Sequence, residues 1–300
     1  MDAIITAAIG YAESELQLFL ESIKRNCNGT KVFLIVLKQD GGKISRLQNK
    51  YSFIEPVYVP KKYVKQKLLT FHVWIAHFLS RVSYLDTNSF LKKIERYLLH
   101  IVIKRFFIAL DIVRNHRNSL TSVMLTDCRD VFIQKNPFEL IDQHLISGLE
   151  PKKIKDEPLT SRWIANIYGE DILSRFSDKR VVCAGVTLGP VGEVEKYLTR
   201  MCSEIWKYLP QVTELKWGSD QGIHNYLIYE KEILCDLTDN QEGLIATLSL
   251  EDPSSLFKDT CSGLIQVDGN YPNIVHQYDR HPDLVNFLKQ QFLPSDQLFA

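Results

Sequence analysis

Residues 121–138 read TSVMLTDCRDVFIQKNPF, and this stretch decides the fold that we expect. The run Ser122–Thr126 is short and β-prone, which favours a buried strand. Two acids follow it, Asp127 and Asp130, and the Asn-Pro pair at 136–137 is typical of a helix start. Carboxylates at the carboxyl end of a strand face the crevice in which open α/β sheets bind ligands. Their oxygens suit Mg²⁺ or Mn²⁺, although Asp is equally typical of a simple turn.

The composition is that of a globular chain without an overall charge. Of 300 residues, 45% are hydrophobic, which is ample for a substantial core. The 36 basic residues balance 36 acidic ones, so no overall field favours nucleic acid and any anion recognition is local. No uncharged apolar run approaches the roughly 18 residues that span a bilayer.

The six cysteines form no Cys-x-x-Cys pair, and the first residues lack the basic region of a secretory signal. We therefore expect reduced thiols in a cytoplasmic protein. The basic, apolar helical pattern of residues 90–113 leaves open a peripheral contact at the inner face of the membrane. A core helix with a solvated basic edge has the same pattern. The oligomeric state also stays open.

The beginning of the chain alternates strand and helix patterns. Apolar runs predict three buried strands, over residues 3–9, 31–37 and 54–59. Residues 12–26 carry the apolar stripe of a helix, and a turn is expected at residues 40–42. This alternation predicts a parallel sheet, in which the loop at residues 6–11 shares the crevice edge with Asp127.

The remaining chain mixes helices with short strands. Helical patterns cover residues 61–114 in two stretches, 160–176, 191–209 and 219–229, the last with Ser219 as its N-cap. Strand patterns cover residues 145–149, 180–188, 233–237, 244–248 and 264–267, and residues 151–158 read as a charged loop. The sequence has no internal repeat, low-complexity tract or convincing linker, which favours one domain.

Four short segments follow one another in an order found in a known family. They are the acids at 127–130, the Cys-Ala-Gly-Val strand at 183–186, the Asp-Gln helix start at 220–221 and Ile274–His276. In these segments the chain resembles the GT-A glycosyltransferases, most nearly the retaining glycogenin-like and lipopolysaccharide galactosyltransferase-like group. Two positions depart from the group: its Asp-x-Asp is Asp-x-x-Asp here, and Cys183 stands where the group has Asn.

The resemblance implies the α/β class and a single Rossmann-like GT-A domain over residues 1–300, with a central, mostly parallel mixed sheet flanked by helices. Residues 1–140 would mainly bind the nucleotide sugar, and residues 141–300 would mainly form the acceptor side and the late metal-ligand strand. It further implies a retaining hexosyltransferase of polysaccharide biosynthesis. The donor would be a nucleotide sugar, with UDP-hexose favoured, and the acceptor a glycan or a lipid-linked glycan.

The resemblance also implies a metal site and a donor site. Asp127, Asp130 and His276 would hold Mn²⁺ or Mg²⁺, which neutralises the leaving diphosphate as a Lewis acid. The donor would be bound by residues of the crevice, namely Thr6, Tyr11, Arg105, Asp127, Ala184 and Gly185.

Three residues would act in catalysis by the same resemblance. Arg105 would reach the donor sugar and phosphate with its planar guanidinium. Asp220 would orient the sugar hydroxyls, and the carbonyl of Gln221 would stabilise a cationic transition state. Ordinary roles stay open, because Asp220 suits a helix start, Arg105 a surface position and His276 the rim of a core.

Two other functions stay open. A nucleotidyltransferase also uses metal-bound acids, but it usually carries a glycine-rich, basic phosphate loop after its first strand. Residues 6–11 contain one glycine and neither Lys nor Arg, which argues against that function. The altered acid spacing and Cys183 also leave open a non-catalytic carbohydrate-binding protein on the same fold.

Overall fold

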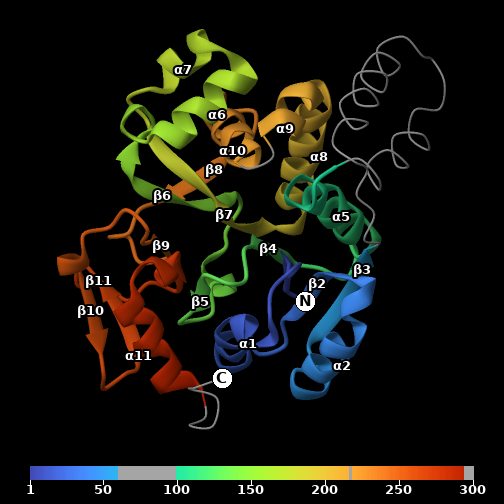
Figure 1. The fold of residues 1–300 in the computed structure, drawn as a ribbon, viewed down its shortest axis with the longest axis vertical. Coiled ribbons are helices and arrows are strands. Elements are labelled where there is room, and N and C mark those ends of the chain that lie inside the picture. The colour runs from blue at the N-terminus through green and yellow to red at the C-terminus, as the bar shows by residue number, and fades with distance from the viewer. Residues whose placement is uncertain (60–98, 216–217, 294–300) are drawn as a thin grey trace.

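The computed structural model of the protein describes residues 1–59, 99–215 and 218–293 (Figure 1). Its largest sheet has seven strands in the order β3-β2-β1-β4-β7-β6-β8. These strands are β1 (Ala3–Ala7), β2 (Lys31–Leu37), β3 (Ile54–Val59), β4 (Ser122–Thr126), β6 (Leu145–Lys153), β7 (Arg180–Pro190) and β8 (Cys235–Thr238). Strand β7 is antiparallel to both neighbours, and the other pairs are parallel. The predicted α/β class with a mostly parallel mixed sheet is confirmed.

Both faces of this sheet are buried under helices. Successive side chains of a strand point to opposite faces, so Ile4 and Leu34 pack with α1 (Glu13–Asn26) and α2 (Gly41–Lys50), whereas Ile5 and Phe33 pack with α5 (Ile101–Asn115) and α8 (Val191–Lys207). Continuous apolar strands such as β2 are therefore required, since neither face meets water.

A second sheet brings distant parts of the chain together. It has the order β5-β12-β9, with β5 (Val131–Ile133), β9 (Ile245–Thr247) and β12 (Ile274–His276). Strand β12 runs antiparallel to β5 and pairs His276 with Val131. Helix α11 (Pro282–Phe292) packs its apolar face on this sheet. The hairpin of β10 (Leu256–Asp259) and β11 (Leu264–Val267) lies at the edge of Figure 1.

Helix α10 (Ser219–Tyr229) is fixed along β7 by one buried side chain. Asn225 accepts a hydrogen bond from the backbone N–H of Val182 and donates one to its carbonyl, both at 2.9 Å. Helices α6 (Pro158–Tyr168), α7 (Glu170–Phe176) and α9 (Leu209–Leu215) lie around α10, at the top of Figure 1. The two hydrogen bonds of Asn225 set the position of the first turn of α10 beside the middle of β7.

Most sequence-predicted elements are found, with four corrections. The expected turn at residues 40–42 opens α2, because Ile44 and Leu47 lie one turn apart and are both buried. Helix α10 begins at Ser219, so its N-cap is Gly218, with φ of 77°, and not Ser219. The Asn-Pro pair at 136–137 opens only a 3₁₀ turn, Phe138–Leu140. Strand β6 continues to Lys153, into the segment expected to be a loop.

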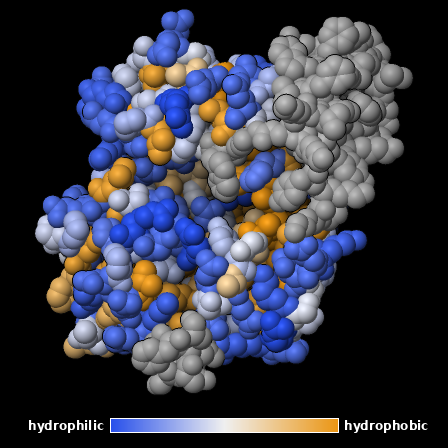
Figure 2. Space-filling view, viewed as in Figure 1, coloured by the Kyte–Doolittle hydropathy of each residue, from blue (hydrophilic) through white to orange (hydrophobic). Residues whose placement is uncertain are grey.

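The basic, apolar helix pattern is partly described. Its second half forms α5, whose apolar face lies in the core, and the helical stretches expected within residues 61–98 lie outside the described residues. None of the helices in the described part of the chain has the length and apolar character needed to cross a bilayer. Hydrophilic residues predominate over the described part of the face shown in Figure 2.

Candidate active site

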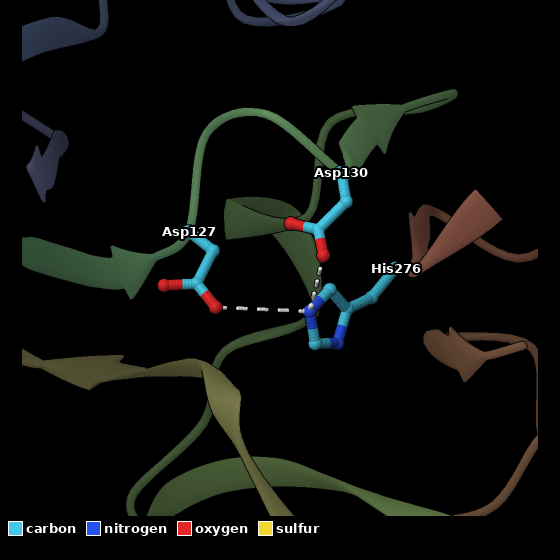
Figure 3. A group of neighbouring side chains, drawn as sticks. All are labelled: Asp127, Asp130 and His276. Atoms are coloured by element: carbon cyan, nitrogen blue, oxygen red, sulfur yellow. Dashed lines mark ion pairs between the residues drawn. The ribbon is translucent and has the colours of Figure 1, made fainter. Parts of the chain in front are cut away.

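Two carboxylates and one imidazole meet where β4 and β12 end. Asp127 follows β4, Asp130 precedes β5, and His276 is the last residue of β12. One ligand atom from each lies within 4.8 Å of the others, and His276 Nε2 is 3.9 Å from an Oδ2 of each acid. Figure 3 shows the three side chains pointing toward one another from different elements.

Backbone hydrogen bonds fix this cluster from two sides. The N–H of Asp127 donates to the carbonyl of Gly185 on β7, at 2.9 Å. The N–H of Gln277 donates to the carbonyl of Asp130 at 2.7 Å, with Gln277 in the left-handed region at φ of 59°. The extra residue of the Asp-x-x-Asp spacing is thus accommodated, and both acids still face His276.

The residues of the cluster fit a divalent cation. His276 Nε2 is buried and has no hydrogen-bond partner among the described residues, and a bound cation would supply the partner that this nitrogen lacks. Burial raises the pKa of Asp130, Asp127 raises it further, and His276 opposes the rise. Carboxylate oxygens with one imidazole nitrogen suit Mn²⁺ or Mg²⁺.

Arg105 connects this cluster to α10. Its guanidinium donates to Asp127 Oδ1 at 2.5 Å and to Asp220 Oδ2 at 2.8 Å. Burial disfavours the charged guanidinium, but the two carboxylates outweigh it and raise the pKa of Arg105. Burial raises the pKa of Asp220, and Arg105 opposes the rise. The arginine therefore stays charged between two acids and holds them together.

Gln221, the next residue of α10, has both ends of its amide engaged. Its carbonyl accepts the N–H of Ala184 at 2.8 Å, and its amide donates to Glu150 Oε1 at 3.1 Å. Sequence reasoning missed Glu150, although an acid inside the apolar run of β6 could have indicated it. The Glu150 side chain is buried, and this burial raises its pKa to about 7.

Cys183 lies against the imidazole of the cluster, with Sγ 3.5 Å from His276 Nδ1. Burial raises the pKa of the thiol well above its ordinary value, and the charge of Glu150 raises it further. The thiol therefore stays protonated and is no nucleophile.

The cleft beside the cluster has a volume of about 380 Å³. It is lined by sequence-predicted site residues, namely Arg105, Asp127, Ala184, Gly185, Asp220, Gln221 and His276. Helix α6 contributes Trp163, whose ring lies over Gly218 at the start of α10, and Leu159, which is 49% exposed. Trp163 was also missed, because an amphipathic helix gives no sign of which aromatic faces a cleft.

Two sequence-predicted donor residues, Thr6 and Tyr11, are not part of the lining of this cleft. Thr6 is buried and lines a narrow neighbouring cavity together with Arg105 and Ala184. Tyr11 is half-buried with Arg129 over its ring, 5.7 Å from the centroid. Arg280 lines the cleft and pairs with Asp279 at 2.9 Å. Trp217 lies outside the described residues.

The comparisons with known proteins agree with this architecture. No protein-family model and no curated protein sequence matches the chain. Among solved structures, the chain is similar to the galactosyltransferase LgtC in complex with donor and acceptor sugar analogs, with a TM-score of 0.52 and 10% identity. The similarity covers 99% of this chain and 98% of that one. At this identity the likeness shows the fold, and the protein has the GT-A fold of glycosyltransferases.

Gly185→Ala should weaken metal binding at the cluster without replacing any of its three proposed ligands. A Cβ at position 185 would lie 2.2 Å from His276 Cε1 and 2.5 Å from Nε2, so the imidazole must move. We expect Mn²⁺ to bind at least about tenfold more weakly, as measured by electron paramagnetic resonance of free Mn²⁺. Gly42→Ala, where a Cβ meets nothing within 4 Å, is the control. Unchanged affinity in folded Gly185→Ala would show that His276 is not a ligand.

Glu150 should make stability depend on pH. Its folded pKa of about 7 lies above the ordinary value of 4.5, so between these values the folded state retains a proton that the unfolded chain releases. The wild type therefore loses stability as pH rises, by on the order of 3 kcal/mol. Glu150→Gln removes this loss. The unfolding free energy of the variant minus that of the wild type, measured in urea with EDTA, should therefore increase as the pH is raised from about 4.5 to about 7.5.

The control for this measurement is Glu214→Gln, at an exposed position of α9. It should keep the wild-type pH dependence. A constant difference between the wild type and Glu150→Gln across this range would contradict the raised pKa.

Proposed function

We propose that this protein is a metal-dependent glycosyltransferase that moves a hexose from a nucleotide diphosphate sugar, with UDP-hexose favoured, to a hydroxyl of a glycan or lipid-linked glycan. The observation that carries the proposal is the cluster of Asp127, Asp130 and His276 in the crevice of a GT-A fold. The similar LgtC structure, which holds donor and acceptor sugar analogs, supports both kinds of substrate.

The cluster and Arg105 suit a leaving group that gains negative charge. Mn²⁺ or Mg²⁺ bound by the cluster would act as a Lewis acid on the diphosphate. Arg105 adds a positive charge beside it, and its orientation is fixed by Asp127 and Asp220 before any substrate binds. Such preorganised charge stabilises a transition state without the cost of reorienting the group.

We further propose that the anomeric configuration is retained. Inversion requires a carboxylate that is free to take the acceptor proton. The acids of α10 and β6 that line the described cleft are engaged, Asp220 by Arg105 and Glu150 by the amide of Gln221. The departing diphosphate oxygen would instead take the proton on the face from which it leaves. A second lone pair of the Gln221 carbonyl is left to face the sugar cation.

The far wall of the cleft suits an acceptor saccharide. Trp163 and Leu159 offer an aromatic and an aliphatic surface, and Gln277 and Arg280 add polar groups to the lining. Pyranose rings combine apolar C–H faces with hydroxyls, so a mainly apolar surface with a few polar groups matches them. Peripheral attachment at the inner face of the membrane, which would bring a lipid-linked acceptor within reach, stays a prediction.

Asp130→Asn should lower turnover of UDP-hexose by on the order of 100-fold, because it keeps the shape of the side chain but removes an anionic ligand. Turnover is followed as Mn²⁺-dependent release of UDP over a panel of UDP-hexoses, with and without saccharide acceptors. Asp111→Asn, an exposed acid on α5, is the control and should behave as the wild type. Full activity of Asp130→Asn in saturating Mn²⁺ would contradict the site.

The configuration of the product distinguishes the mechanisms. Proton NMR of the transferred hexose should show the anomeric configuration of the donor. An inverted product would leave the metal site standing and make Glu150, whose pKa is suited to a base near neutral pH, the expected proton acceptor. Binding of nucleotide sugar without turnover, with or without metal, would favour a carbohydrate-binding protein.

A further inference from the structure

The two ring nitrogens of His276 face different kinds of side chain. Nε2 faces the carboxylates of Asp127 and Asp130, whereas Nδ1 faces Sγ of Cys183 at 3.5 Å. His276 is 1% exposed and Cys183 is 4% exposed. Water therefore has little access to this contact, and the thiol is the group that Nδ1 meets.

The strand that carries this thiol is fixed by the first turn of α10. The carbonyl of Gln221 accepts the N–H of Ala184, the residue after Cys183, at 2.8 Å. The amide of the same side chain donates to Glu150 Oε1 on β6 at 3.1 Å. Hydrogen bonds thus hold β7 beside the thiol, and burial together with the charge of Glu150 raises the pKa of the thiol and keeps it protonated.

The contacts of the ring determine which imidazole nitrogen carries the hydrogen. A thiol has one weak donor and weak acceptor lone pairs. A hydrogen on Nδ1 meets the sulfur lone pairs of Cys183 at 3.5 Å. A hydrogen on Nε2 would be a buried donor without a partner among the described residues, since both acids lie 3.9 Å away. A neutral imidazole with its hydrogen on Nδ1 has the lone pair on Nε2, the nitrogen that faces the two acids.

We propose that Cys183 is a positioning residue, which holds His276 in the tautomer and orientation that direct Nε2 to a divalent cation. The inference rests on the metal site of the proposed function. Cys183 is no ligand in this arrangement, because its sulfur contacts the nitrogen on the far side of the ring.

The experiment compares Cys183→Ala with Cys183→Ser, and uses Cys27→Ala, which removes another buried thiol, as the control. Mn²⁺ affinity is measured by electron paramagnetic resonance without any sugar nucleotide. Cys183→Ala should bind Mn²⁺ about tenfold more weakly or worse, since loss of a group that orients a ligand typically costs 10- to 100-fold. Cys183→Ser can still donate and accept, and it should stay within about threefold of the wild type, as should Cys27→Ala.

The tautomer supplies a second readout that a purely structural role would not move. In ¹⁵N-labelled, metal-free wild type, the NMR signals of His276, assigned with His276→Gln, should show the hydrogen on Nδ1. Cys183→Ala should show a mixture of tautomers. Hydrogen on Nε2 in the wild type would overturn the proposal, whatever Cys183→Ala shows.

The same measurements distinguish a failure of this inference from a failure of the proposed metal site on which it depends. A wild type that binds no Mn²⁺ would overturn the metal site and the inference together. A wild type that binds Mn²⁺, with equal affinity and tautomer in Cys183→Ala, would overturn the inference alone and leave the proposed function standing.

Discussion

The cleft depends on the ion pairs of Arg105. Without this guanidinium, Asp127 and Asp220 would face each other across a partly dry crevice, and at least one would have to be protonated or turn away. Arg105 lies on α5, Asp127 follows β4 and Asp220 opens α10, so a single side chain sets the spacing of three elements around the reaction centre. A buried charge with both neighbours in place is costly to disturb, which keeps the acids where a substrate can use them.

Local patterns were enough to predict the framework of the fold. Strands β1 to β4 could be recognised from their apolar runs. Both faces of the sheet are covered, so each strand must be apolar throughout. The acids after β4 could be predicted as crevice residues because they follow the carboxyl end of a predicted strand. The assembly of the cluster could not, since it depends on the pairing of β12 with β5, between residues far apart in the chain. The resemblance supplied His276, and spacing alone would not have done so.

The roles of the supporting side chains could not be predicted from the sequence, for a different reason. Glu150 and Cys183 each sit in a strand where an apolar residue would be ordinary, and their roles follow from what lies on the neighbouring element. Gln221 shows the same limit: its place at the start of α10 was predicted, but its hydrogen bonds to Ala184 and Glu150 depend on how α10 is clamped along β7. Contacts across elements decide such roles, and no local pattern encodes them.

The central claim is that one divalent cation is held by Asp127, Asp130 and His276 and in turn holds the diphosphate of a sugar nucleotide. Electron-nuclear double resonance on the Mn²⁺-loaded protein with UDP tests it most directly. The account predicts two couplings on the same ion, one to the ¹⁴N of His276, lost in His276→Gln, and one to the ³¹P of UDP. Bound Mn²⁺ that shows phosphorus coupling without nitrogen coupling, or no phosphorus coupling at saturating UDP, would contradict it.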